Sequence, residues 1–129
     1  PPLTPKWKAS GGIAYAIDLG DTGTLTPRFD IEHQSKTYSD PANNGFYPAG
    51  MPVPAQFADL NPFLIPGRTT MNARLTYDSP DKEWQISAAV KNLTNEFYWT
   101  NSFAFYFTGT GQRIIAAPRE WSISVRRSF

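Results

Sequence analysis

The sequence contains no cysteine and only one histidine, His33. Without thiols, neither a disulfide framework nor a thiolate metal site can form. A nucleophile activated by histidine would have only His33 to use, and we expect a structural or membrane-interface role for that side chain. The formal net charge is only +1, with Lys and Arg spread along the chain, so no basic patch for nucleic acid is present. These absences predict a protein that is not an enzyme, needs no metal or cofactor and binds no nucleic acid.

Long apolar runs are also missing. The longest, residues 13–17 and 103–107, are far shorter than the about 20 residues that a membrane-spanning helix needs. The strands of a membrane β-barrel are only half apolar, so a barrel remains open. The chain begins with Pro1-Pro2 and shows neither an initiator Met nor a signal peptide. We therefore expect it to be part of a longer, exported protein whose beginning lies upstream.

Alternation with a period of two residues is the strongest pattern that the sequence does have. It predicts strands over residues 7–18, 25–38 and 68–78, a fourth from Trp84, and a fifth over 119–129. The alternation slips near residues 92–94, which suggests a bulge, after which the fourth strand is expected to resume through Phe97 and Trp99 and project from the sheet. The predicted fold class is all-β: an antiparallel up-and-down meander of about five long strands.

The last strand is unusual because its alternation reaches the end of the sequence. Trp121, Ile123, Val125 and Phe129 fall on one face, whereas most soluble domains end in a frayed polar tail. Within the strand cores, Arg127 is the only charged residue that falls in the apolar phase. Eight steps from Trp121 to Phe129 cover roughly 26 Å, which is compatible with spanning the apolar band of a membrane. This strand suggests the hypothesis that the chain is part of an outer-membrane β-barrel.

The connections alternate in length. Residues 19–23 and 79–83 form short turns, whereas 39–67 and 93–118 are long. Alternating loop lengths and aromatic residues at strand ends are typical of transmembrane barrels. A soluble β-sandwich that binds a ligand through its long loops also alternates and keeps its charges on the wet face, and it is the main alternative. A porin-like channel is a third.

Two groups of residues are candidates for contact with a solute. The first is the polar phase of the strands, which would face a barrel lumen and contact a solute or a plug, or simply form a solvated wall: Arg28, Asp30, Glu32, Gln34, Arg74 and Lys91. The second is the set of loop aromatics, which would bind a ligand or pack the loops together: Phe46, Tyr47, Phe57, Phe63, Trp99, Phe103, Phe105 and Tyr106.

The second half of the chain resembles the carboxyl-terminal end of TonB-dependent outer-membrane receptors. The resemblance rests on Met71-Asn-Ala-Arg-Leu-Thr-Tyr77, Ser79-Pro-Asp81 with Trp84, Val90-Lys-Asn-Leu-Thr-Asn-Glu-Phe-Tyr98, and Pro118-Arg119 before the strand that ends at Phe129. The Lys-Asn-Leu-Thr-Asn-Glu-Phe-Tyr run is its most specific part. Pro5-Lys-Trp-Lys8 and Leu25-Thr-Pro-Arg28 are also similar to late strands of that family, so the resemblance covers nearly the whole chain.

The resemblance implies a fold and a function. The fold is a transmembrane barrel of about 22 strands with a plug in its lumen, of which residues 1–129 would be the carboxyl-terminal part. The implied function is energy-dependent uptake of siderophores, cobalamin or oligosaccharides across the bacterial outer membrane. The implied partners are outer-membrane lipid, the protein's own plug domain, the TonB complex and the barrel-assembly machinery. Residues 19–23 and 79–83 would be periplasmic, and 39–67 and 93–118 extracellular.

The family also implies a role for the closing strand, as an assembly signal. Trp121, Ile123, Val125 and Phe129 fit that signal. Arg127 departs from it, because an aromatic or apolar residue is usual at this position.

Overall fold

The computed structural model describes residues 3–39, 63–105 and 110–128, and their regular structure is all β except for one short 3-10 turn. The chain divides into two compact units. The sheet unit comprises Ala9–His33, Thr69–Glu96 and Ala117–Phe129. The hairpin unit comprises Pro1–Lys8, Gln34–Arg68 and Phe97–Ala116. Each unit is described by itself below.

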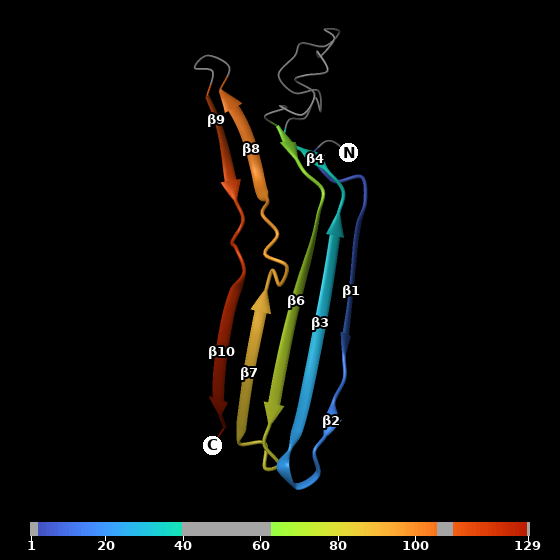
Figure 1. Cartoon of the computed structure of the whole chain (residues 1–129), viewed down its shortest axis with the longest axis vertical. Helices are drawn as coiled ribbons and strands as arrows, with labels where there is room; N and C mark the ends of the chain where they lie inside the picture. Colours follow the sequence, from blue (N-terminus) through green and yellow to red (C-terminus); the bar gives the residue numbers. More distant parts are fainter. Residues whose placement is uncertain (1–2, 40–62, 106–109, 129) are drawn as a thin grey trace. The chain divides into compact units, whose positions relative to one another are not determined.

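The sheet unit is an antiparallel meander whose strands follow one another in sequence order (Figure 1). Its order is β1 (Lys8–Ala14), β3 (Thr24–Gln34), β6 (Arg68–Asp78), β7 (Trp84–Lys91) and β10 (Glu120–Arg127), with the short β2 (Ile17–Asp18) also paired to β3. The predicted up-and-down meander of five strands is therefore confirmed. The strand predicted over 7–18 is divided into β1 and β2, and the one predicted over 25–38 is divided into β3, which ends at Gln34, and the short β4 (Thr37–Tyr38).

The strand register confirms the two faces that the alternation predicts. Residues of the apolar phase stand directly opposite one another in rows across β6, β7 and β10: Ala73, Val90 and Trp121; Leu75, Ala88 and Ile123; Tyr77, Ile86 and Val125. Each row brings apolar side chains within reach of their cross-strand neighbours. One face of the sheet is thus apolar from strand to strand.

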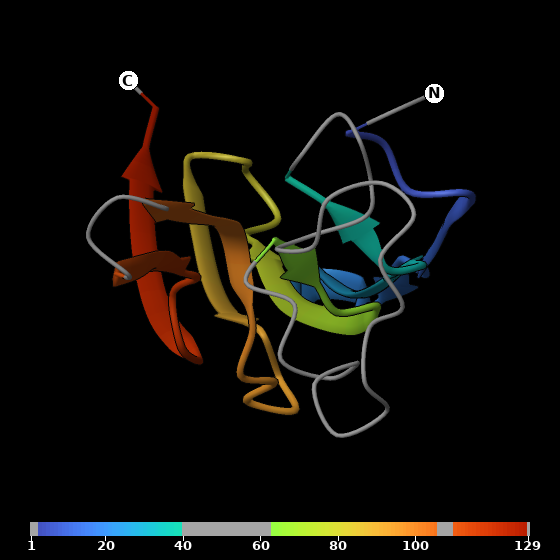
Figure 2. The same cartoon turned by 90° about the horizontal axis from the view of Figure 1, so that it is seen from above.

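This apolar face is exposed. Ile13 and Trp121 are each 72% exposed and Ile123 is 79% exposed, whereas Val90 is 6% exposed. In a soluble β-sandwich such residues would pack against a second sheet and form the core. The sheet twists and curves across its strands (Figure 2). A curved single layer with one apolar and one polar face is the arrangement of a barrel wall.

The first short turn depends on glycine. The 3-10 turn η1 (Gly20–Thr22) joins β2 to β3, and Gly20 and Gly23 adopt φ angles of 62° and 106°. A Cβ on Gly23 would lie 2.2 Å from the carbonyl oxygen of Asp78. Both the backbone conformation and the close approach of the strand end therefore require glycine at this position. The predicted turn at residues 19–23 is confirmed.

The second short turn, residues 79–83, is closed by its own side chains. Ser79 donates its backbone N–H to the carbonyl of Trp84 at 2.9 Å, and its hydroxyl donates to the carboxylate of Asp81. The Glu83 N–H donates to Asp81 Oδ1 at 3.0 Å. These hydrogen bonds, that from the Ser79 hydroxyl first, lower the pKa of Asp81 below its ordinary value because they stabilise the ionised carboxylate.

The hairpin unit contains two pairs of strands. β4 (Thr37–Tyr38) pairs with β5 (Leu64–Ile65), and β8 (Trp99–Phe105) pairs with β9 (Thr110–Ile115). Two predictions were wrong here. The segment 93–118 was predicted as a long connection into which the fourth strand resumes through Phe97 and Trp99. A strand, β8, does begin at Trp99, but it pairs with the unpredicted β9 in a hairpin. The irregularity near residues 92–94 is a turn that ends β7 at Lys91, and the register shift lies farther on, between Trp99 and Asn101.

Candidate functional site

The polar phase of the strands forms the second face of the sheet. Ser87 and Ser124 hydrogen-bond through their hydroxyls at 2.7 Å across β7 and β10, and Gln85 Nε2 donates to Asp78 Oδ1 at 2.8 Å across β6 and β7. The two residues of each pair stand directly opposite each other in the register. The face is therefore a polar wall tied together by side chains as well as by its backbone ladder.

A bidentate ion pair on β3 adds to the polar contacts on this face. Arg28 Nε donates to Asp30 Oδ2 at 2.8 Å, and Nη2 donates to Oδ1 at 2.7 Å. The two residues are two apart, so their side chains project from the same face of the strand. A Cβ on Gly12 would lie 2.4 Å from Asp30 Oδ1, so the glycine on β1 leaves the space that this carboxylate occupies. A bidentate pair of this kind holds both side chains in one geometry.

Arg74 and Lys91 join this pair around a shallow hollow of about 370 Å³, which Asn72 and Ser122 also line. Three cations and one carboxylate border the hollow, so its formal charge is positive. Of the polar residues that the sequence singles out, four therefore come together: Arg28, Asp30, Arg74 and Lys91. Glu32 lies two residues farther along β3 and does not line the hollow, and Gln34 ends that strand in the hairpin unit.

The run Lys91-Asn-Leu-Thr-Asn-Glu96 folds into a turn organised by Asn92. Asn92 and Asn95 have φ angles of 51° and 54°, a conformation that asparagine tolerates better than most residues. The Asn92 side chain accepts from the Glu96 N–H at 2.8 Å and donates to the Glu96 carbonyl at 2.9 Å and to that of Ala117 at 3.4 Å. Asn95 Oδ1 accepts the N–H of Arg119 at 3.0 Å. These hydrogen bonds therefore hold the turn against residues 117–119, which lead into β10.

The aromatic side chains that the sequence proposes for ligand contact fall into two groups. Trp99 and Phe103 lie in β8, and Phe63 is buried next to β5, at 7% exposed. Phe105 belongs to β8, but its side chain is not described. Phe46, Tyr47, Phe57 and Tyr106 lie outside the described residues.

Trp99 has a clear structural contact. Its Nε1 donates to the carbonyl of Leu64 at 2.9 Å, which joins β8 to β5 within the hairpin unit. The guanidinium carbon of Arg113 lies 4.3 Å from the centroid of the same indole ring, a favourable cation–π geometry. Phe103, in contrast, borders a hollow of about 330 Å³ together with Gln112 and Arg113. Of the three ligand-contact candidates whose side chains are described, Phe63, Trp99 and Phe103, only Phe103 borders this hollow.

Sequence reasoning missed the arginines that stack on aromatic rings. Arg68 lies 4.4 Å from the centroid of Tyr98, and Arg113 lies over Trp99 as above. Alternation assigns Arg68 to the polar phase of its strand but does not indicate the ring that it covers, and no strand was predicted around Arg113. His33, which stands in the apolar phase, hydrogen-bonds through Nδ1 to the Thr69 hydroxyl at 2.7 Å, which agrees with the expected structural role.

The closing strand presents its apolar residues outward. Trp121, Ile123 and Val125 are 72%, 79% and 60% exposed, and Phe129 lies outside the described residues. Arg127, which interrupts the pattern, lies with its guanidinium carbon 5.0 Å from the ring of Trp84, and its Nη2 is 4.0 Å from Glu83 Oε2. Its charge is therefore placed between an aromatic ring and a carboxylate at the end of the strand, which accounts for its presence on an apolar face.

Across residues 3–39, 63–105 and 110–128, no group of three or more histidine or acidic side chains is arranged to hold a metal ion. In the same residues, no helix has the length and apolar character needed to cross a membrane.

Comparison with solved structures identifies the fold. The chain superposes on part of the ferric yersiniabactin uptake receptor FyuA from Yersinia pestis with a TM-score of 0.77 and 20% identity, over 99% of this chain and 17% of that one. It also superposes on part of BauA, the ferric preacinetobactin receptor from Acinetobacter baumannii, with a TM-score of 0.67 and 24% identity, over 100% of this chain and 16% of that one.

Comparison of the sequence with family models and with curated proteins found no match. The chain spans less than a fifth of each receptor on which it superposes. The resemblance to TonB-dependent receptors that the sequence motifs carry is therefore confirmed at the level of the fold. The chain has the fold of a segment of the β-barrel of a TonB-dependent receptor.

Proposed function

We propose that this chain is part of the barrel of a bacterial outer-membrane receptor that takes up a ferric siderophore by TonB-dependent transport. The observation that carries the proposal is the single-layer meander with one exposed apolar face and one polar face, which shares its fold with two siderophore receptors. An exposed apolar face of this extent is stable only against hydrocarbon or another apolar surface.

The two ends of the apolar face suit the two surfaces of a membrane. Arg119 lies 6.0 Å from the ring centroid of Trp121 near one end of β10, and Arg127 lies over Trp84 at the other. Eight residue steps separate the two arginines, or roughly 26 Å before tilt, against an apolar band about 25 Å tall in such barrels. Between them the same phase carries only Trp121, Ile123 and Val125. The strand is thus apolar where lipid tails would lie and cationic at both ends.

In this orientation the polar face lines the lumen. The turns at residues 19–23 and 79–83 are then periplasmic, and the segments 39–67 and 93–118 are extracellular. The hollow bordered by Arg28, Asp30, Arg74 and Lys91 becomes a positive stretch of the barrel wall, in contact with the plug domain or with a passing solute, and Glu32 and Gln34 continue this wall outward.

Ligand contact is proposed for the extracellular aromatics, because aromatic side chains give large contact areas at a low entropic cost. Phe103 and Arg113 border open space in the described hairpin. Phe46, Tyr47, Phe105 and Tyr106 are the remaining candidates, and Trp99 contributes by holding the hairpin against β5. The partners of the whole protein would be outer-membrane lipid, its own plug domain, the TonB complex and, during biogenesis, the barrel-assembly machinery.

Iron uptake tests the proposal directly. The complete gene that encodes this chain is expressed in an iron-starved bacterial host without siderophore receptors of its own, with and without TonB. We expect the protein in the outer-membrane fraction and accumulation of radioactive iron from a panel of ferric siderophores only when TonB is present. A soluble product, or uptake by simple diffusion that is independent of TonB, would overturn the proposal.

A further inference from the structure

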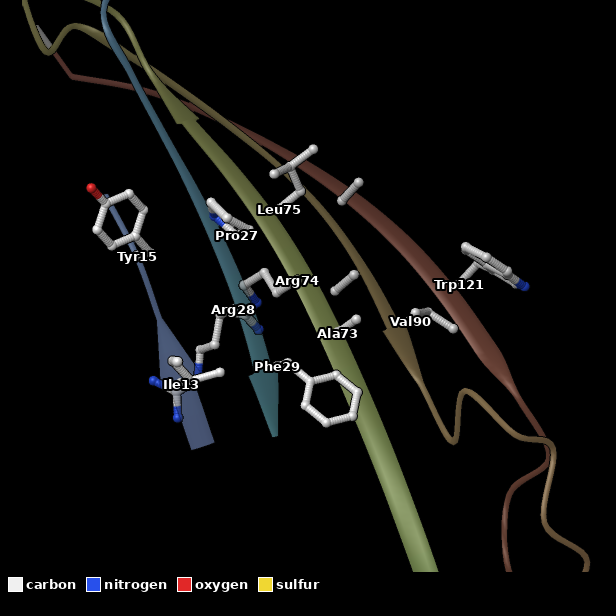
Figure 3. A pocket seen from close by; sticks show the side chains of 12 residues that line it. Ile13, Tyr15, Pro27, Arg28, Phe29, Ala73, Arg74, Leu75, Val90 and Trp121 are labelled. Atoms are coloured by element: carbon white, nitrogen blue, oxygen red, sulfur yellow. The ribbon is translucent and has the colours of Figure 1, made fainter. Parts of the chain in front are cut away.

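A groove of about 550 Å³ runs over the apolar face of the sheet unit (Figure 3). Small side chains make it: Ala73 on β6 and Ala88 on β7 leave space that Ile13, Tyr15, Phe29 and Trp121 surround. Its volume lies within the range of about 300–1,000 Å³ that is typical of small-molecule sites. The face is therefore hollowed at one place, near the Trp121 end of the sheet, instead of being uniformly covered with large side chains.

A cation without a carboxylate partner stands beside this groove. Arg119 is in phase with Trp121, its side chain is exposed, and its guanidinium lies 6.0 Å from the Trp121 ring. Its Nη1 donates to the Leu93 carbonyl at 3.4 Å. Within the described residues no acidic side chain lies within ion-pair distance of it, whereas Arg127, at the other end of the strand, has Glu83 at 4.0 Å.

We propose that this groove is a binding site for one membrane lipid, whose acyl chain fills the groove and whose headgroup phosphate binds Arg119. The proposal rests on the membrane location proposed above, because only there does hydrocarbon lie against this face. The apolar lining of the groove and the positive charge of Arg119 together indicate what occupies the site. An acyl chain matches the apolar groove, and an anionic headgroup gives Arg119 the negatively charged partner that no acidic side chain of the described residues supplies.

Trp121 joins the two parts of the site. Its ring forms a wall of the groove and lies beneath the Arg119 guanidinium, so the acyl chain and the headgroup would meet at this residue. An amphipathic ring of this kind is favoured at the boundary between hydrocarbon and headgroups. A second copy of the protein is the other possible occupant of an apolar groove, and the dimer outcome of the experiment below distinguishes it from a lipid.

Native mass spectrometry of the complete receptor in mild detergent tests the site, with phosphatidylglycerol and phosphatidylcholine added in turn. We expect the wild type to retain one phosphatidylglycerol molecule in preference to phosphatidylcholine. Arg119→Gln should weaken phosphatidylglycerol retention about tenfold and remove the preference, and Arg119→Lys should keep it. Arg127→Gln is the matched control and should behave as the wild type, because that arginine already has a carboxylate partner.

Ala88→Phe fills the groove and should reduce retention of both lipids. Electrophoretic mobility of the folded barrel verifies that the variant is assembled, and Ala73→Leu gives a smaller filling of the same groove. Equal retention by Arg119→Gln and the wild type, or undiminished retention by both filling variants, would overturn the proposal, as would a dimer that Ala88→Phe dissociates. Lipid retention without any iron uptake would refute the proposed transport function and leave the lipid site standing.

Discussion

Replacement of Asn92 by alanine should destabilise the barrel far more than its position in a turn suggests. Asn92 is only 6% exposed, and its side chain makes two short hydrogen bonds to the backbone of Glu96, at 2.8 and 2.9 Å. Its φ angle of 51° lies in the left-handed region. Alanine removes both hydrogen bonds and adopts that conformation less readily.

The magnitude follows from these two losses. A hydrogen bond between neutral groups contributes about 1 kcal/mol, so the two bonds to Glu96 give about 2 kcal/mol. The left-handed conformation costs a residue with a Cβ about 1 kcal/mol more than glycine. Asparagine also carries a Cβ but tolerates this conformation better than alanine, so its own backbone cost lies between those of glycine and alanine. We therefore expect Asn92→Ala to lower the free energy of unfolding by about 2 to 3 kcal/mol, and Asn92→Gly by about 1 kcal/mol less than Asn92→Ala, because glycine avoids the backbone penalty.

Urea denaturation of the complete receptor in phospholipid vesicles, followed by tryptophan fluorescence, measures the change. Thr94→Ala is the matched control, because Thr94 lies in the same turn with an exposed side chain, and its replacement should change stability by less than about 0.5 kcal/mol. The reasoning would be refuted if Asn92→Ala were no more destabilising than Thr94→Ala. An Asn92→Gly variant less stable than Asn92→Ala would refute the backbone part alone.

Three further predictions concern the short turns and the closing strand. Gly23→Ala should prevent normal assembly, since its Cβ would lie 2.2 Å from a backbone oxygen at a φ of 106°, whereas Gly11→Ala, which meets nothing within 4 Å, should give wild-type yields of heat-modifiable barrel. Hydrogen bonds lower the pKa of Asp81, so its contribution to stability should be present above the ordinary aspartate pKa of about 3.9 and be lost as the pH falls through the lowered folded value. An Asp81→Asn variant should remove that acidic phase from the dependence of unfolding on pH, and an unchanged phase would assign it to another group. Phe129→Ala should reduce the outer-membrane yield measured by immunoblot while Arg127→Tyr leaves it intact or improves it, and equal yields for Phe129→Ala and the wild type would remove the assembly-signal interpretation.

Alternation was sufficient to predict the sheet because a strand exposes its successive side chains to opposite faces. Residues 68–78 were predicted as a strand and form β6 with the same bounds. Trp121 was assigned to the apolar face of its strand, and it stands opposite the apolar Val90 in the register. Strand β8 was predicted only as a continuation of the fourth strand through Trp99, and β9 was not predicted. The glycine and threonine content of this segment is typical of loops, and only the pairing between the two strands makes it regular.

For the candidate sites, too, one part could be predicted from the sequence and another part depended on the tertiary structure. The sequence by itself determined which residues share the polar face, because period-two phase is a property of the single strand. It could not determine that Arg28, Asp30, Arg74 and Lys91 border one hollow, since that depends on how β3, β6 and β7 are staggered. The ring over which each arginine lies, and the groove that Ala73 and Ala88 open beside Arg119, were likewise decided by register and side-chain packing between strands far apart in the chain. Local chemistry thus determines the faces of this protein, and only the pairing of distant strands determines its sites.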